Sequence, residues 1–357
     1  MLPHRPGIFL VGYFVLKNWL VRMERENALP RIIVRDMNSG DEHAIAFDEE
    51  AYSLGFGEMR EYDTDILRFT YSSMTTPAQV FDYNMRDRTR VLRKTQEVPS
   101  GHEPANYVTR RILAPAHDGE LIPVTLLYRK STPLNGTAPL WLYGYGSYGI
   151  SIPAGFNTNI LSLVDRGFIY AIAHIRGGEE KGRRWYKTGK LEHKNNTFRD
   201  FISCAEHLIK AGFTTKGNIV AQGGSAGGML MGAVANRAGE LFAGLVAELH
   251  EVTQRARVGL GQMAELGLGQ VLLLGGPERE LDGVVTVDLV RAHGGDRTGT
   301  GLQDGDALDA AVLHEELGHP ELLGENGSHH ATSLISMSTP AGRWSRRWSE
   351  STVLGVG

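Results

Sequence analysis

The sequence has a single cysteine, Cys204, among its 357 residues. A disulfide framework and a zinc site made of several cysteines both need more thiols, so each is excluded. An excess of basic residues is missing too. The net charge of −4 argues against a protein that binds nucleic acid by neutralising its phosphates. We therefore expect a cytoplasmic protein, held in a reducing compartment, with no nucleic-acid partner.

A long apolar run is absent near the N-terminus. The stretch from Ile8 to Leu16 is followed at once by Lys17 and Asn18, and it is far shorter than the ~20 apolar residues of a membrane-spanning helix. No small-residue cleavage site follows it, so the pattern favours a β-strand over a signal peptide. We expect no association with a membrane.

Three residue types are absent from the last part of the chain. All 12 Tyr, all 12 Phe and every Lys lie in residues 1–250, whereas residues 251–357 contain 18 of the 44 Gly. The net charge is +3 for the first range and −7 for the second. One chain therefore contains two kinds of sequence.

Residues 9–100 have the pattern of short β-strands. Ile32 and Val34 lie two positions apart between Arg31 and Arg35, before a turn at 38–40, and similar segments follow. Strands of this kind suit a sandwich or a propeller. A propeller blade takes ~40–50 residues, so residues 1–100 would form a partial β-propeller of about two blades. A small independent β-sheet is the alternative.

Strands and helices alternate over residues 108–250. The helix expected from 198 to 209 carries apolar residues at i, i+3, i+4 and i+7, so one of its faces packs on a sheet. Asn196 or Thr197 is expected to cap this helix, and Gly212 to end it. The order of elements implies a parallel sheet covered on both faces. The expected strands are 124–128, 140–143, 168–173, 219–221 and 243–247, and the other helices are 160–165 and 229–236.

The pattern Gly223-x-Ser225-x-Gly227 lies between a predicted strand and a predicted helix. That context is typical of a nucleophile elbow, in which glycines permit a sharp turn and the serine hydroxyl is held away from the sheet. The start of the helix offers the backbone N–H of Ala226 to a developing oxyanion. The alternative is a glycine-rich turn whose serine only caps the helix.

Residues 223–236, Gly-Gly-Ser-Ala-Gly-Gly-Met-Leu-Met-Gly-Ala-Val-Ala-Asn, resemble the nucleophile segment of the prolyl oligopeptidase family of serine peptidases. Within that family they resemble the oligopeptidase B type. The resemblance covers roughly residues 9–248. Further segments that carry it are 71–79, 93–99, 142–149, 173–178, 185–186 and 194–198.

The resemblance implies an α/β-hydrolase fold, incomplete at the C-terminus and preceded by a β-propeller fragment. It divides the chain into 1–100 (partial propeller), 101–248 (the N-terminal part of the catalytic domain, with the nucleophile) and 249–357 (an atypical tail). The start of the chain also looks truncated, because most of a propeller is absent.

The resemblance also assigns roles to residues. Ser225 would be the nucleophile, and the Tyr145 hydroxyl would bind the oxyanion together with the N–H of Ala226; the alternative for Tyr145 is an aromatic packing residue. His174 is expected to be a satisfied core histidine, and Arg176 to hold a carboxylate or shape its loop.

The implied function is hydrolysis of short peptides, after Arg or Lys, by a serine peptidase that needs no cofactor or metal. A propeller would admit short peptides and exclude folded proteins. Two other classes stay open. One is a non-peptidase α/β-hydrolase such as an esterase, and the other is an inactive remnant.

The family pattern stops near residue 248. The acidic pair for a basic substrate side chain, the triad Asp and the triad His have no matching positions in 249–357. His293 comes too soon after Ser225 to be the triad histidine, and His314 and His319 are five apart, whereas the HExxH zinc motif needs four. We hypothesise that 249–357 was translated in a shifted frame or comes from a rearranged gene, so that this chain would be impaired.

Overall fold

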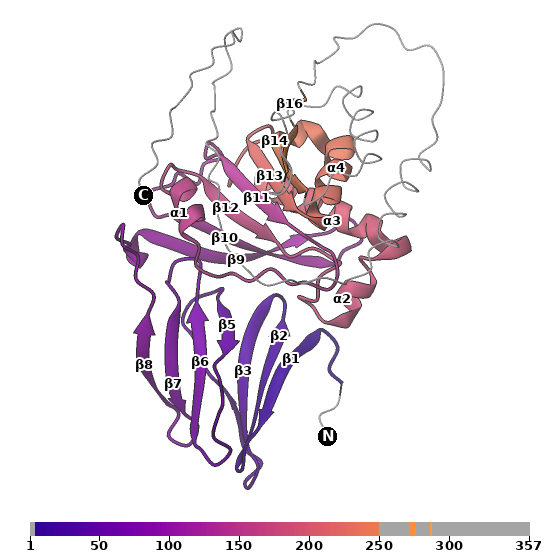
Figure 1. The fold of residues 1–357 in the computed structure, drawn as a ribbon. Helices are drawn as coiled ribbons and strands as arrows, with labels where there is room; N and C mark the ends of the chain where they lie inside the picture. Colours follow the sequence, from indigo (N-terminus) through magenta and orange to yellow (C-terminus); the bar gives the residue numbers. More distant parts are fainter. Residues whose placement is uncertain (1–3, 250–270, 276–285, 288–357) are drawn as a thin grey trace, which may run out of the picture. The chain divides into compact units, whose positions relative to one another are not determined.

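The computed structural model describes residues 4–249, 271–275 and 286–287 (Figure 1). Apart from the short strands near its beginning, the expected tail 249–357 lies outside these residues. No helix within the described ranges is long and apolar enough to cross a membrane.

Two four-stranded antiparallel sheets make up the first part of the chain. In each sheet every strand pairs with the strand next to it in sequence, as in consecutive hairpins. The apolar stretch near the N-terminus forms the first strand, as expected. The strands of the first sheet are β1 (Ile8–Val15), β2 (Trp19–Glu26), β3 (Leu29–Asp36) and β4 (Glu42–Ala44), and those of the second are β5 (Ser53–Phe56), β6 (Ile66–Ser72), β7 (Gln79–Asn84) and β8 (Thr89–Thr95).

An apolar core joins these two sheets. Val21, Ile32 and Val34 of the first sheet and Leu67 and Phe69 of the second are fully buried in one cluster. Along β6 the buried Leu67 and Phe69 alternate with the exposed Arg68 and Thr70, because one face of the strand is turned to this core. Two four-stranded antiparallel sheets are what the expected propeller fragment requires.

An eight-stranded sheet follows, with strand order β16-β15-β14-β13-β11-β12-β10-β9. The middle of the sheet is parallel, as the alternation of strands and helices predicts. The strands are β9 (Tyr107–Pro115), β10 (Leu121–Arg129), β11 (Leu140–Gly144), β12 (Ile169–Ala173), β13 (Ile219–Gly224), β14 (Phe242–Leu249), β15 (Val271–Gly275) and β16 (Thr286–Val287).

The prediction of a parallel sheet for residues 108–250 is wrong at β10, and the sheet has a second antiparallel pair beyond that range. β10 pairs antiparallel with β9 and with β12, and β16 pairs antiparallel with β15. The physical reason at the first edge is the short connection 116–120, because so few residues can join two neighbouring strands only as a hairpin. β9 was not predicted.

Helices cover both faces of this sheet, as predicted (Figure 1). α3 and α4 pack in one apolar cluster with the strands, and α1 packs in another cluster with the side chains of the opposite face. The helices are α1 (Thr158–Val164), α2 (Arg183–Lys187), α3 (Lys194–Lys210) and α4 (Ala226–Ala238), and short 3-10 turns occur at Pro104–Asn106, Leu191–His193 and Gly239–Leu241.

The predicted N-cap of α3 is wrong. The helix begins at Lys194, with His193 at the cap position. Thr197 is buried within the first turn, and its hydroxyl donates to the backbone carbonyls of Arg176 and Gly189 at 2.8 and 2.9 Å. Tertiary contacts therefore use the hydroxyl that was expected to cap the helix. Gly212 does follow the C-terminal end, with the left-handed φ of 78° typical of that position.

Candidate active site

The chain turns sharply between β13 and α4. Ser225 occupies the turn with φ 53° and ψ −120°, a left-handed φ that costs a non-glycine residue about 1–3 kcal/mol. A Cβ atom on Gly223 would lie 2.3 Å from the carbonyl oxygen of Gly227, and one on Gly227 would lie 3.2 Å from the carbonyl oxygen of Gly144. The first of these positions admits only glycine, and the second leaves almost no room for a side chain.

Ser225 does not act as a helix cap. Its side chain makes no capping hydrogen bond to α4, and the residue is exposed. The alternative interpretation of the glycine-rich turn, a serine that only caps the helix, is therefore wrong. The hydroxyl hydrogen-bonds instead to the hydroxyl of Tyr145.

The sheet brings Tyr145 to Ser225. β11 and β13 are neighbouring parallel strands, with Tyr143 opposite Gln222 in the register. Because parallel strands run in the same direction, the residues that follow them meet at one edge of the sheet. Tyr145 comes directly after β11 and Ser225 directly after β13. The two hydroxyls, 80 positions apart in the sequence, therefore meet at that edge.

The phenol of Tyr145 is held in its neutral form. Partial burial raises the pKa of its hydroxyl, the neighbouring Tyr148 raises it further, and the hydrogen bond from Ser225 acts in the opposite direction. A pKa above the ordinary value of 10 leaves the proton on the oxygen at neutral pH. Tyr145 is therefore available as a hydrogen-bond donor.

Ala226 is the first residue of α4. Its backbone N–H is one of the donors at a helix start that have no carbonyl partner one turn earlier, and it lies at the positive end of the helix dipole. The structure therefore brings together all three residues of the predicted site, Ser225, Tyr145 and Ala226. Their catalytic roles stay predictions.

His174 comes directly after β12, the parallel neighbour of β11, and its side chain is buried in the core. Only 1% of the residue is exposed, and its Nε2 is 2.9 Å from the hydroxyl oxygen of Thr125. Its Nδ1 has no hydrogen-bond partner and is 3.9 Å from Oε1 of Glu180. The prediction of a satisfied core histidine is therefore right about its burial and about Nε2, but wrong about Nδ1.

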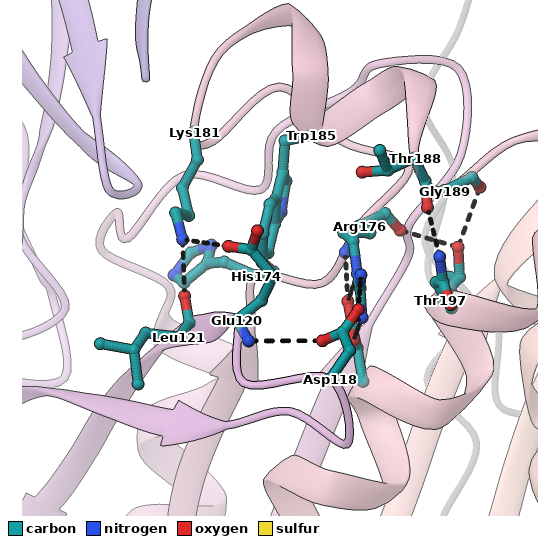
Figure 2. A network of polar contacts seen from close by, with 12 residues as sticks. Asp118, Glu120, Leu121, His174, Arg176, Lys181, Trp185, Thr188, Gly189 and Thr197 are labelled. Carbon is teal, nitrogen blue, oxygen red and sulfur yellow. Dashed lines mark hydrogen bonds and ion pairs between the residues drawn. The ribbon is translucent and has the colours of Figure 1, made fainter. Parts of the chain in front are cut away.

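Arg176 holds two carboxylates, as one of its two predicted roles required (Figure 2). Its Nε and Nη2 donate to Asp200 at 2.8 and 2.5 Å, its backbone N–H donates to the same carboxylate, and Nη1 donates to Asp118 at 2.5 Å. The guanidinium also stacks over Trp185, 5.7 Å from the ring centroid. We call these four residues the Arg176 network.

Burial and pairing oppose each other in the Arg176 network. Burial acts against the charge of Arg176, but the hydrogen bonds and charges of Asp200 and Asp118 outweigh it and raise the pKa of the guanidinium. Burial raises the pKa of Asp200, and Arg176 offsets part of that shift. Asp200 was missed in the sequence, although an acid three residues after Thr197 and four before Cys204 is a recognisable signal on a buried helix face.

The described residues contain no histidine hydrogen-bonded to Ser225. The three histidines named from the sequence lie outside these residues, and so do any later positions for a triad Asp: they are His293, His314 and His319. Within the part of the chain that the structure describes, no group of three or more His, Cys, Asp or Glu side chains is arranged to hold a metal ion.

Comparisons with known proteins give two family matches. Residues 154–252 match the model of the prolyl oligopeptidase family, and residues 1–96 match that of the prolyl oligopeptidase N-terminal beta-propeller domain. The first match ends close to residue 248, where the sequence loses its resemblance.

Curated relatives match over part of their length. Dipeptidyl aminopeptidase BI of Pseudoxanthomonas mexicana is 47% identical over 240 residues, which is 67% of this chain and 33% of that protein. Protease 2 of Moraxella lacunata is 37% identical over 234 residues, which is 66% of this chain and 34% of that protein. The chain therefore spans about a third of the length of these relatives.

Solved structures match in the same way. Oligopeptidase B from Trypanosoma brucei, in a closed form with covalently bound antipain, has a TM-score of 0.65 and 42% identity, covering 69% of this chain and 36% of that one. Oligopeptidase B from Leishmania major has a TM-score of 0.64 and 38% identity over the same shares.

Proposed function

The chain belongs to the prolyl oligopeptidase family of serine peptidases, and from this premise we propose that it hydrolyses short peptides with Ser225 as the nucleophile. The observation that carries the proposal is the exposed, left-handed Ser225 hydrogen-bonded to Tyr145 at the start of α4. A serine presented in this way can approach a carbonyl carbon from outside the sheet.

The proposed first step forms a bond between the Ser225 oxygen and the scissile carbonyl carbon. The electron pair of the carbonyl moves to its oxygen, and the hydroxyl proton passes to a general base. The hydroxyl of Tyr145 and the N–H of Ala226 donate to the resulting oxyanion, which removes part of the cost of its charge. In this family the base is expected to be a histidine, which the described residues do not supply at Ser225.

The substrate class is proposed from the similar enzymes. The likeness to oligopeptidase B supports short peptides cleaved after Arg or Lys. The covalently bound antipain in the enzyme from Trypanosoma brucei is consistent with attack by a nucleophilic side chain. We also propose a cytoplasmic location, because a single cysteine suits a reducing compartment.

We further propose the division of the chain into 1–100, 101–248 and 249–357. The loss of Tyr, Phe and Lys after residue 250 and the end of the family match at 252 support a shifted reading frame or a rearranged gene for the last part. Translation of the other two frames downstream of codon 248 tests this. An Asp and a His in family context are expected there, and their absence from both frames contradicts the frameshift.

A fluorophosphonate probe tests the proposed nucleophile directly, because it reacts with activated serines. We expect labelling of the folded protein that the Ser225→Ala variant abolishes, and mass spectrometry locates the adduct. Ser225 makes no capping hydrogen bond, so the variant should fold, which circular dichroism checks.

Two results bear on the other classes of function. Hydrolysis of p-nitrophenyl esters without any hydrolysis of Arg-amide substrates would assign the protein to the esterases. A folded protein that the probe leaves unmodified contradicts the proposed nucleophile and leaves an inactive remnant.

A further inference from the structure

One face of α3 holds the backbone on both sides of Tyr145. A Cβ atom on Gly144 would lie 2.7 Å from the ring of Phe201, and one on Gly146 would lie 2.4 Å from the methyl group of Thr197. Thr197 and Phe201 are four residues apart and therefore share a face of the helix. The segment that carries Tyr145 is thus seated directly on α3.

Lys194 completes this face, three residues before Thr197. Its side chain is buried, with only 6% of the residue exposed. Its Nζ donates to the carbonyl oxygen of Gly146 at 2.8 Å and to the hydroxyl oxygen of Ser147 at 2.6 Å. These acceptors belong to the two residues that follow Tyr145 in the chain.

The position of Lys194 is costly for a lysine. Lysines are rarely buried, and a positive charge in the first turn of a helix lies at the unfavourable end of its dipole. Lys194 is the first residue of α3. The bonds that its ammonium group donates to Gly146 and Ser147 offset part of these costs.

The turn after Tyr145 needs such support. Gly146 has a left-handed φ of 68°, and Tyr148 has one of 56°, which is unfavourable for a residue with a side chain. The N–H of Gly149 donates to the carbonyl of Gly177 at 2.9 Å, which holds the far end of the turn. Lys194 holds the near end, next to Tyr145.

We propose that Lys194 is a positioning residue that fixes the Gly146–Ser147 turn and thereby holds the Tyr145 hydroxyl against Ser225. This inference rests on the proposed function, in which Tyr145 is an oxyanion donor. Lys194 does not touch the reacting atoms. It acts through the backbone, and a misplacement of about 1 Å in such a group costs up to ~100-fold in rate.

Lys194→Met tests the proposal, since it keeps the length of the apolar stem and removes the three donors. We expect fluorophosphonate labelling of Ser225 to slow by about tenfold to a hundredfold. The matched control is Lys181→Met. Lys181 also donates to a backbone carbonyl, that of Leu121 at 3.0 Å (Figure 2). Ser225 in the Lys181→Met variant should be labelled at the rate of the unmodified protein.

A double-mutant cycle with Tyr145→Phe separates positioning from general support of the structure. If Lys194 acts through the Tyr145 hydroxyl, adding Lys194→Met to Tyr145→Phe slows labelling by less than about twofold. An equal slowing in both backgrounds overturns the proposal, as does a folded Lys194→Met variant that labels at the unmodified rate. If Lys194→Met fails to fold, Ser147→Ala, which removes one acceptor of the ammonium group, takes its place in the cycle.

Hydrogen exchange gives a readout that does not need an active serine. The amides of residues 145–149 should exchange faster in Lys194→Met, or in Ser147→Ala, than in the unmodified protein. Their exchange rates should not change in Lys181→Met. If the unmodified protein folds but is not labelled, the proposed function fails. Hydrogen exchange is then the only test of whether Lys194 fixes the Gly146–Ser147 turn. Unchanged exchange then overturns the proposal.

Discussion

The Ser225–Tyr145 pair and the Arg176 network belong to the same α/β part of the chain but are built in opposite ways. Ser225 is exposed and neutral, and its sharp turn requires a left-handed backbone φ of 53°. Arg176 and Asp200 are buried and paired, with 3% and 0% of each residue exposed. Groups proposed to react are thus left accessible, whereas charges that only support the fold are enclosed and matched.

This contrast has an energetic basis. A buried charge without a partner costs several kcal/mol, so the loss of either buried charge of the network, Arg176 or Asp200, should be strongly destabilising. A neutral hydroxyl at the surface keeps access to water and can lose its partner at little cost. Changes in the Arg176 network should therefore appear in stability, and changes at Tyr145 in reactivity.

The largest effect on stability is expected from Arg176→Met. The substitution leaves Asp200 buried beside no positive charge, which should lower the free energy of unfolding by about 3–5 kcal/mol. Urea denaturation followed by circular dichroism measures it. Arg60→Met is the control, because the side chains of Arg60 and its partner Glu58 are 83% and 77% exposed, and its effect should stay within about 0.5 kcal/mol. If Arg176→Met lowers the free energy of unfolding by less than about 1 kcal/mol, the buried charges of the network do not depend on their pairing.

Tyr145→Phe should have the opposite signature. Removing one oxyanion donor costs about 10²–10³ in rate, or roughly 2.7–4 kcal/mol, so fluorophosphonate labelling of Ser225 should slow by that factor while the free energy of unfolding barely changes. Tyr148→Phe is the matched control, since Tyr148 is 59% exposed three residues away. Equal labelling rates for the two variants would leave Tyr145 as a packing residue.

Gly223→Ala tests the elbow itself, with a smaller effect on stability. The new methyl group would lie 2.3 Å from the carbonyl oxygen of Gly227, and the backbone must shift, at a cost of about 1–3 kcal/mol. Thermal unfolding compares it with Gly244→Ala, where the added methyl meets nothing within 4 Å. If the two variants are equally stable, the close approach at Gly223 does not constrain the turn.

The sequence predicted those features that depend on neighbouring residues. The elbow could be predicted because Gly223, Ser225 and Gly227 carry its steric requirement within five positions. The buried strands could be predicted from their apolar runs. Gly212 was placed correctly, since a helix end has a local signature.

Features that depend on distant partners could not be predicted. Thr197 looked like a helix cap, but its hydroxyl bonds to Arg176, 21 residues earlier. The acceptors of Lys194 lie 47 and 48 residues away, and no local pattern marks such a pair. The antiparallel pairing of β10 with β12 was missed for the same reason, because Val124 and its partner Ala173 are 49 residues apart.

Asp82 is intermediate between the exposed Ser225 and the buried Arg176 network, and its substitution should have the smallest effect on stability. It is mostly buried on β7, but its partners Arg68 and Arg93 have side chains 52% and 54% exposed. The hydrogen bond from Arg68 lowers the pKa of Asp82, burial opposes this, and Arg93 lowers it further. Because water screens both partners, Asp82→Asn should cost only about 1 kcal/mol or less at neutral pH.

The pH dependence of that cost identifies its cause. A carboxyl whose pKa is lower in the folded than in the unfolded state stabilises the fold above its ordinary value of 3.8, and this contribution is lost as pH falls through the lower, folded value. The difference in unfolding free energy between the unmodified protein and Asp82→Asn should therefore be constant near neutrality and shrink below pH 3.8. If the difference persists in acid, Asp82 stabilises the protein through packing rather than through its charge. The exposure of Arg68 and Arg93 would then not explain the small cost of the substitution.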